Sequence, residues 1–212
     1  MSLTMQKMYI GGRWVAATSG QTRKIINPFN QQLIAEVAEG DREDAKAAIA
    51  AARQTFDSGI WSGQSGAARG ALLYRLSELI ERERETLAEL ESLDTGKTVE
   101  ESRWDMDDIA GIFRYYAGLA DKDGGEVIDS PVADSSSRVV REPVGVCGQI
   151  SPWNYPLLQA AWKLAPALAA GCTVVLKAAP DTPWSATTLG RIVKEYTDIP
   201  AGVFNVITSA DP

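Results

Sequence analysis

The sequence predicts an α/β protein in which helices and short strand pairs precede a parallel β-sheet. Short β-type runs stand near the start of the chain, and apolar residues recur at helical spacing through its middle. Over the last third, apolar strands alternate with helices in the order strand–helix–strand–helix–strand. This alternation is typical of a parallel sheet whose connections are right-handed crossovers.

Two strand pairs and a helix are expected at the start of the chain. Residues 8–15 and 24–37 carry β-type runs that are interrupted by turn-forming residues. Asp41 is a good N-cap, because its short side chain accepts hydrogen bonds from the free N–H groups of a first helical turn. The alanine-rich residues 43–56 that follow are therefore predicted to form a helix.

Two longer helices are expected next. Leucine and isoleucine recur at helical spacing over residues 67–91, which predicts one helix with the charged residues 81–85 on its solvated face. Residues 94–97 break this pattern, and a third helix follows to about Leu119.

Residues 124–141 differ in composition from the helices before them. Residues 126–128 and 138–141 are predicted to be the two strands of a hairpin with a long polar tip. The edges of this hairpin are unpaired in the predicted sheet order, and exposed strand edges are normally covered. We therefore expect the hairpin to contact another subunit.

The last third carries the strands and helices of the parallel sheet. Pro156 suits the first position of a helix, and Gly171 stands where a helix ends in a left-handed residue. In such sheets ligands bind beyond the carboxyl ends of the strands, so residues 151–154 and 177–180 are candidates for a binding site. The predicted order is a strand at residues 144–150, a helix at 157–170, a strand at 173–176, a helix led by Pro183 and Ser185 to about Thr197, and a strand at 202–207.

Composition and charge exclude several classes of function. The net charge of −7 argues against a nucleic-acid partner, because phosphate binding needs clustered Lys and Arg. The chain has no histidine, which excludes Ser-His-Asp catalysis, His-ligated zinc and an imidazole base within it. The longest apolar stretch, residues 157–176, is interrupted by polar residues and by Pro166 and Gly171, so no membrane span is expected.

The two cysteines, Cys147 and Cys172, stand in apolar segments and form no CxxC pair. We interpret both as reduced thiols of an intracellular, cytoplasmic protein. Cys147 is rejected as a nucleophile, because nothing cationic adjoins it in sequence and buried apolar thiols are inert. The same reasoning applies to Cys172.

One run of residues makes the chain recognisable. Residues 142–156 resemble the segment of the aldehyde dehydrogenase superfamily that ends in Pro-Trp-Asn-Tyr-Pro, here residues 152–156. The resemblance covers nearly the whole chain, in the right order. Further matching segments are Tyr9-Ile10-Gly11-Gly12-Arg13-Trp14, Ile26-Asn27-Pro28, Asp94-Thr95-Gly96-Lys97, Tyr115-Tyr116-Ala117-Gly118, residues 161–163 and 165–171, Val174-Val175-Leu176-Lys177 and residues 199–206.

The resemblance implies an enzyme that oxidises a small aldehyde to a carboxylic acid and passes a hydride to NAD or NADP. It implies a Rossmann-like part of the cofactor-binding domain over residues 143–212, an N-terminal part of that domain over residues 1–123, and an oligomerisation hairpin over residues 124–142 that builds a homodimer or homotetramer. It places the nucleophilic cysteine, the general-base glutamate and the glycine-rich turn under the cofactor pyrophosphate beyond Pro212. The alternative is a truncated, non-catalytic module that binds a nucleotide or oligomerises.

The resemblance also assigns roles to two residues at the strand ends. Asn154 would donate from its side-chain amide to the oxyanion that forms when a thiolate attacks the aldehyde. The alternative is a turn asparagine that bonds to its own backbone. Lys177 would reach the ribose hydroxyls of the cofactor, and the alternative is a strand-end lysine that simply lies in water.

Several neighbours of these residues are also cofactor candidates. Many relatives carry a glutamate at the position of Pro180, where it accepts hydrogen bonds from ribose hydroxyls and repels the extra phosphate of NADP. Pro180 does neither, so appreciable use of NADP is expected. Trp153 could equally belong to the core. The cofactor is expected to contact backbone and ring atoms of Ile150, Ser151, Pro152, Trp153, Ala179 and Pro180.

Two further candidates follow from the resemblance. Lys163 matches a lysine that is assigned a proton-relay role in some betaine-aldehyde-type relatives, and the alternative is a lysine whose charge snorkels to water. Asp94 and the carbonyl of Ile26 resemble a monovalent-cation site of some relatives, since such an ion takes hard oxygen ligands. An aspartate that caps a turn is the alternative. Betaine aldehyde, aminoaldehydes and simple aldehydes all remain open as substrates.

Overall fold

The computed structural model of the chain describes residues 4–122 and 124–211, and its central element is a five-stranded sheet with the order β3-β2-β10-β9-β8. β8, β9 and β10 are parallel neighbours, and helices α5 and α6 connect them. The predicted parallel α/β sheet is therefore confirmed. The bounds are β8 Val146–Ile150, α5 Pro156–Ala170, β9 Thr173–Ala178, α6 Trp184–Tyr196 and β10 Phe204–Thr208.

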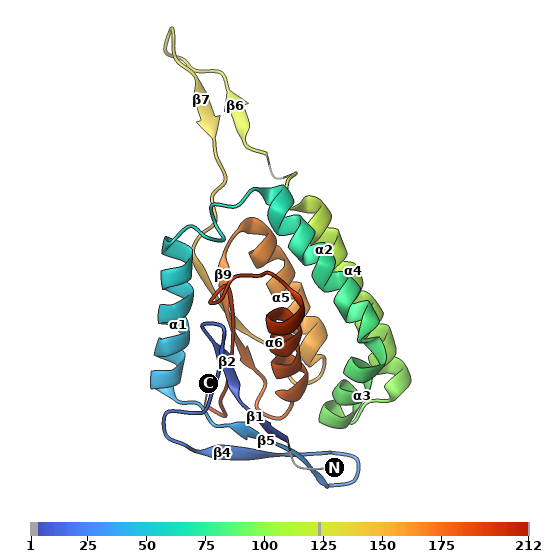
Figure 1. Cartoon of the computed structure of the whole chain (residues 1–212). Helices are drawn as coiled ribbons and strands as arrows, with labels where there is room; N and C mark the ends of the chain where they lie inside the picture. The colour runs from blue at the N-terminus through green and yellow to red at the C-terminus, as the bar shows by residue number, and fades with distance from the viewer. Residues whose placement is uncertain (1–3, 123, 212) are drawn as a thin grey trace.

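Helices cover both faces of this sheet (Figure 1). Val175 of β9 packs in one cluster with Ala48 and Ala52 of α1 (Arg42–Asp57) on the first face. Val174 and Leu176 belong to the main core, which α5 and α6 share on the opposite face. Because successive side chains of a strand point to opposite faces, an uninterrupted apolar run fits only a strand that is covered on both sides.

An outer layer of three helices lies over α5 and α6 (Figure 1). They are α2 (Gly66–Arg82), α3 (Arg84–Thr95) and α4 (Val99–Leu119). The single helix predicted over residues 67–91 is wrong, because the chain leaves helical geometry at Glu83, where φ is −91° and ψ is 10°. The break turns α3 away from the line of α2, so that α3 packs against both α4 and α6.

The charged residues near this break do more than form a solvated surface. Arg114 of α4 bonds to Glu81 of α2 at 2.7 Å, and Arg84 of α3 bonds to Asp107 of α4 at 2.6 Å. These ion pairs join the three outer helices to one another. Each exposed pair contributes little by itself, on the order of 0–1 kcal/mol.

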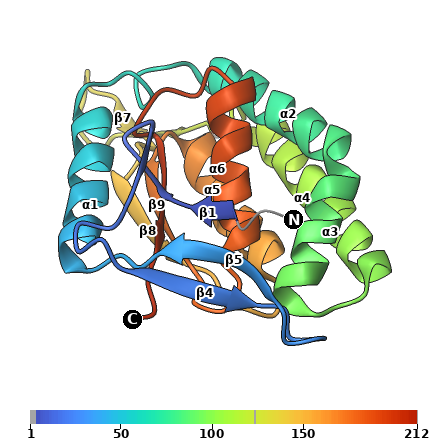
Figure 2. The same ribbon diagram turned by 60° about the horizontal axis from the view of Figure 1, so that its bottom comes forward.

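A second, three-stranded sheet lies beside the main one (Figure 2). It contains the predicted strand pair β4 (Thr22–Ile26) and β5 (Leu33–Ala38) and also a strand that the sequence did not predict, β1 (Thr4–Gln6). β1 runs parallel to β5. Its three residues are too few to carry a recognisable strand pattern, and its position follows from the backbone edge that β5 offers.

The other predicted strand pair, β2 (Met8–Ile10) and β3 (Arg13–Val15), forms a hairpin that joins the main sheet. β2 pairs antiparallel with β10. A chain segment from the beginning of the sequence therefore extends the sheet that the last third builds. Among the described residues, no helix is both long and apolar enough to cross a membrane.

The predicted hairpin projects away from the rest of the molecule (Figure 1). Its strands are β6 (Glu126–Ile128) and β7 (Ser137–Val139), so the second strand begins and ends earlier than the predicted residues 138–141. Within the described ranges, β6 and β7 pair only with each other. The side chain of Val127 is 80% exposed, which leaves an apolar surface in water.

Candidate functional site

The two segments nominated from the sequence lie side by side at the carboxyl ends of β8 and β9. Ile150 is the register partner of Lys177, and the backbone N–H of Ser151 donates to the carbonyl oxygen of Lys177 at 3.2 Å. β9 continues to Ala178, so Lys177 lies within the strand and not after its predicted end. The sheet thus brings the candidate residues of both segments to one edge.

The turn between β8 and α5 carries Asn154. Pro156 is the first residue of α5, and no side chain of the preceding residue Tyr155 caps the helix. Asn154 is exposed, and its side-chain amide makes no hydrogen bond to any residue in the described ranges. The alternative was a turn asparagine whose side chain bonds to its own backbone. Among the described residues, Asn154 makes no such hydrogen bond. The alternative of a core Trp153 is wrong, since that side chain is 62% exposed.

Lys177 has a charged environment and is only partly exposed. Burial lowers the pKa of its ammonium group, and the nearby guanidinium of Arg23 lowers it further, whereas Glu39 and Asp211 raise it. Arg23 also bonds to Glu39 at 2.6 Å. Lys177 is thus not a lysine that simply lies in water.

The segment after β9 is anchored by the same arginine. Arg23 Nη1 donates to the carbonyl oxygen of Pro180, which ties this segment to β4. Ala179 is buried, with 3% of its surface exposed, and Asp181 is exposed. Ser151 is also buried, and its hydroxyl has no hydrogen-bond partner among the described residues.

Lys163 lies on α5, about two turns after its first residue, Pro156. Its ammonium group donates to the carbonyl oxygen of Gln159 at 3.1 Å and to the side-chain Oε1 of Gln159 at 3.2 Å. Within the described ranges, no contact joins Lys163 to Asn154. The structure therefore does not bring these two candidates together.

The structure supports the rejection of both cysteines as nucleophiles. Burial raises the pKa of Cys147 to about 11, and the neighbouring Cys172 raises it as well. Cys172 itself is 3% exposed. A thiol with a pKa this high holds almost no thiolate at neutral pH, so Cys147 is a poor nucleophile.

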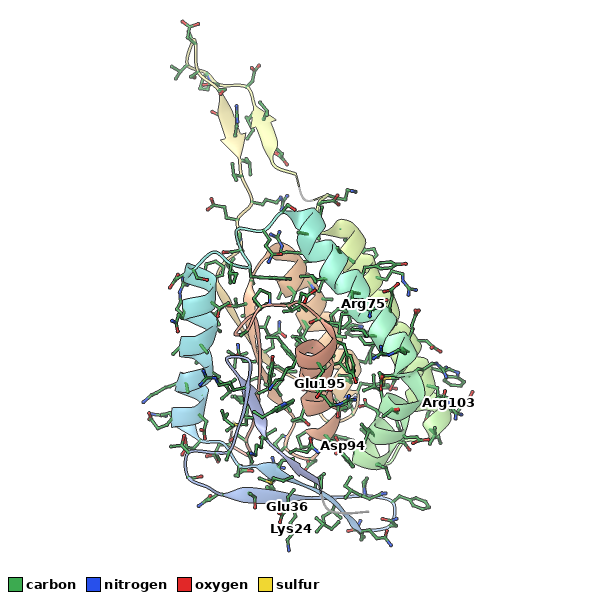
Figure 3. The ribbon with its side chains drawn as sticks, in the orientation of Figure 1. Lys24, Glu36, Arg75, Asp94, Arg103 and Glu195 are labelled. Carbon is green, nitrogen blue, oxygen red and sulfur yellow. The ribbon has the colours of Figure 1, made fainter. Side chains whose placement is uncertain are left out.

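Asp94 has a different partner from the one expected. Its Oδ2 accepts a hydrogen bond from the backbone N–H of Trp184 at 2.8 Å, so it caps the start of α6 and not its own turn. In Figure 3 it lies in the interior, where the ends of α3 and α6 meet. Burial raises the pKa of Asp94 well above its usual value, and Oδ1 has no partner in the described part of the chain.

A cation at Asp94 and Ile26 finds limited support in the described ranges. Oδ1 of Asp94 is a buried carboxylate oxygen without a partner among the described residues, and so is Oε2 of Glu91. No group of three or more His, Cys, Asp or Glu side chains that could hold a metal ion occurs there.

Three residues near the Asn154 turn were missed by the sequence reasoning. The buried carboxylates Glu91 and Asp105 and the partly buried Lys97 gather behind Tyr155 and the first turn of α5. One signal could have found Glu91: it follows Leu87 by four residues, which places a carboxylate on the apolar stripe of the helix.

A groove of about 380 Å³ opens between α4 and α5. Tyr115 is 63% exposed and Trp162 is 52% exposed, although both are large aromatic side chains. Asp107 is bound to Arg84, whereas Asp108 has no ion pair with any described residue. The groove is lined by Asp107, Asp108, Gly111, Ile112, Tyr115 and Trp162.

The chain is similar in sequence to known enzymes over nearly its whole length. It is 59% identical to betaine aldehyde dehydrogenase of Bacillus subtilis (strain 168) over 202 residues, which cover 95% of this chain and 41% of that protein. It is 46% identical to the human mitochondrial aldehyde dehydrogenase over 209 residues, covering 97% of this chain and 40% of that protein. The chain thus spans about two-fifths of the length of these relatives.

Solved structures agree with the sequence comparison. The crystal structure of betaine aldehyde dehydrogenase from Staphylococcus aureus in complex with NAD+ superposes with a TM-score of 0.94 and 53% sequence identity. The match covers 97% of this chain and 41% of that one. The model of the aldehyde dehydrogenase family matches residues 14–212, and the chain therefore belongs to that family.

Proposed function

We propose that the protein is an NAD(P)-dependent aldehyde dehydrogenase, which oxidises an aldehyde to a carboxylic acid, with this chain supplying the oxyanion donor and part of the cofactor site. The observation that carries the proposal is the exposed amide of Asn154, which bonds to no described residue and lies in the segment after β8, whose last residue Ile150 is the register partner of Lys177. A pre-oriented amide stabilises negative charge on oxygen as that charge develops. The nucleophile and the general base would come from outside these residues.

The carboxyl edge of β8 and β9 suits a dinucleotide. The nicotinamide cofactor supplies hydride acceptance when it is bound. In the proposal the ammonium of Lys177 donates to a ribose hydroxyl, while Ile150 to Trp153 and the segment at Ala179 and Pro180 line the cofactor. Open α/β sheets bind ligands at this edge, and the similar Staphylococcus aureus structure is a complex with NAD+.

For the substrate we propose an aldehyde that carries a quaternary ammonium group. Two of the relatives described above are betaine aldehyde dehydrogenases. The groove between α4 and α5 offers the exposed rings of Trp162 and Tyr115. Aromatic faces attract such cations, and the carboxylate of Asp108, which has no ion pair with any described residue, adds negative charge beside them.

We further propose that the hairpin joins subunits into a homodimer or homotetramer, and that residues 1–123 and 143–212 together form one cofactor-binding domain. The hairpin pairs with no other strand in the described part of the chain, and its valines are exposed. The antiparallel pairing of β2 with β10 supports the shared domain, because it joins the two parts in one sheet.

The first prediction tests the role of Asn154. In the whole enzyme, Asn154→Ala should lower kcat by about 10²–10³, the usual loss for one oxyanion donor. The dissociation constant of the cofactor should hardly change, because the amide faces the reacting oxygen. Steady-state kinetics and cofactor titration measure both values. A kcat within about threefold of wild type would show that Asn154 is not the donor.

The second prediction tests the substrate class. The ratio of kcat/KM for betaine aldehyde to that for its neutral isostere, with a tert-butyl group in place of trimethylammonium, should fall about tenfold in Trp162→Leu. The exposed ring of Tyr74 lies on α2, away from the groove, so Tyr74→Leu is the matched control and should leave the ratio unchanged. An equal loss for both substrates would mean that Trp162 provides only apolar contact.

The third prediction concerns the choice of cofactor. Pro180 carries no charge, and Arg23 and Lys177 supply positive charge beside it, so the enzyme should use NADP as well as NAD. Pro180→Glu should shift the ratio of kcat/KM toward NAD by about tenfold, roughly 1.4 kcal/mol. Asp181→Asn, which alters an exposed carboxylate one residue later, is the control. Strong rejection of NADP by the wild type, unchanged by Pro180→Glu, would assign the choice to another residue.

The fourth prediction concerns assembly. Val127→Asp should reduce the oligomer to a smaller species in sedimentation velocity, because it places a charge in the proposed interface. The side chain is 80% exposed, so the fold of the subunit should be unaffected. Phe29→Asp changes a side chain that is 87% exposed elsewhere and is the control. A wild-type protein that sediments only as a monomer would contradict the proposed assembly.

A further inference from the structure

The segment Asp94-Thr95-Gly96-Lys97 turns a charged side chain into the interior. α3 ends at Thr95, and Gly96, which follows it, has a left-handed φ of 78°. A Cβ at this position would lie 2.8 Å from Cγ of Pro28, so only glycine fits without displacing that ring. The reversal sends Lys97 back toward the core, where 12% of its side chain is exposed.

Lys97 has three neighbours that fix the place of its ammonium group. Nζ lies 2.6 Å from Oδ2 of Asp105 and 3.9 Å from Oε1 of Glu91. It also lies 4.2 Å from the centre of the Tyr155 ring, within the range of a cation–π contact. Asp105 is on α4 and Glu91 is on α3, so the ammonium joins both helices to the residue that precedes α5.

Glu91, on α3, contacts the beginning of α5. Its Oε1 faces the backbone N–H of Leu157 at a long distance of 3.5 Å, in the first turn of α5. That turn has no side-chain N-cap bond, and the first N–H groups of a helix need acceptors. Burial raises the pKa of Glu91 to about 7, while the hydroxyl of Ser185 and the charge of Lys97 lower it.

These contacts are made to the residues that follow Asn154. Tyr155 is held through its ring by Lys97, and Leu157 is faced by Glu91. Asn154 is exposed and has no hydrogen bond of its own to any described residue, so its orientation depends on its neighbours. A displacement of about 1 Å at a reacting group lowers a rate by as much as 10²-fold.

We propose that Lys97, held by Asp105 and Glu91, is a positioning residue that fixes the Tyr155 turn and thereby aims the amide of Asn154. The role concerns orientation and not the total stability of the fold, because a buried ion pair is weak evidence for stability. The kinetic part of the test rests on the proposed function. The first measurement below does not.

The first test follows backbone hydrogen exchange in the 212-residue chain. Lys97→Gln keeps a donor for Asp105 but removes the charge above the Tyr155 ring. Exchange of the N–H groups of Leu157 and Gln159, which bond to Glu91 and to the carbonyl oxygen of Tyr155, should accelerate by about tenfold or more relative to the rest of the chain, because local opening follows local contacts. Asp44→Asn is the control: it also alters a buried side chain with several hydrogen bonds, on α1 and far from the turn.

Two outcomes of this measurement would overturn the proposal. One is unchanged exchange at the turn in Lys97→Gln. The other is acceleration spread evenly over the chain, as general destabilisation would give. Lys97→Arg, which keeps the charge, should restore slow exchange at the turn.

The second test is a double-mutant cycle in the whole enzyme. Lys97→Gln should lower kcat by about tenfold in the wild-type background and by less than about twofold when Asn154 is already alanine. The KM for the cofactor should stay constant. Tyr155→Leu should mimic Lys97→Gln, whereas Tyr155→Phe keeps the ring and should stay within about threefold of wild type.

Failure of this inference is distinguishable from failure of the proposed function. Equal effects of Lys97→Gln in both backgrounds would show that Lys97 does not act through Asn154. An enzyme in which Asn154→Ala itself has no effect would refute the oxyanion role, and hydrogen exchange alone would then decide whether Lys97 holds the turn.

Discussion

The burial of β9 on both faces is the constraint on which the rest of this structure depends. Val174, Val175 and Leu176 are all buried, so the strand needs apolar cover on either side. α1 covers one face, and α5 and α6 cover the other. Removing this apolar surface from water is worth about 25 cal/mol per Å². The parallel pairing with β8 and β10 follows, because crossover helices are the elements that cover both faces.

This arrangement also decides where the chemistry can lie. Parallel neighbours end on the same side, so the segments after β8 and β9 meet at one edge although 26 residues of sequence separate register partners such as Ile150 and Lys177. Polar side chains can lie at this edge because the apolar residues of β8 and β9 stop before it. Arg23 from β4 reaches the same edge and binds the backbone of Pro180, so a segment from the start of the chain completes it.

The buried charged residues around α3 show which features can be predicted from the sequence and which depend on tertiary contacts. Apolar periodicity predicted helical structure over residues 67–91, but it gave no sign of the break at Glu83. The break depends on contacts of α3 with α6, which lie far apart in sequence. Asp94 looked like a turn cap, and it caps α6 instead, because α6 begins beside it in space. Glu91 and Asp105 are paired by Lys97 for the same reason.

The sequence by itself determined the parallel sheet, its helices and the edge that holds Asn154 and Lys177, because apolar periodicity and turn residues act over short distances. The cap at Asp41 was predicted for the same reason, and its carboxylate accepts from Glu43 and Asp44 as expected. Tertiary structure alone decided the position of β1, the exposure of Trp153 and the contact of Lys97 with Tyr155. These features depend on which distant segments meet, and local propensity carries no information about such long-range contacts.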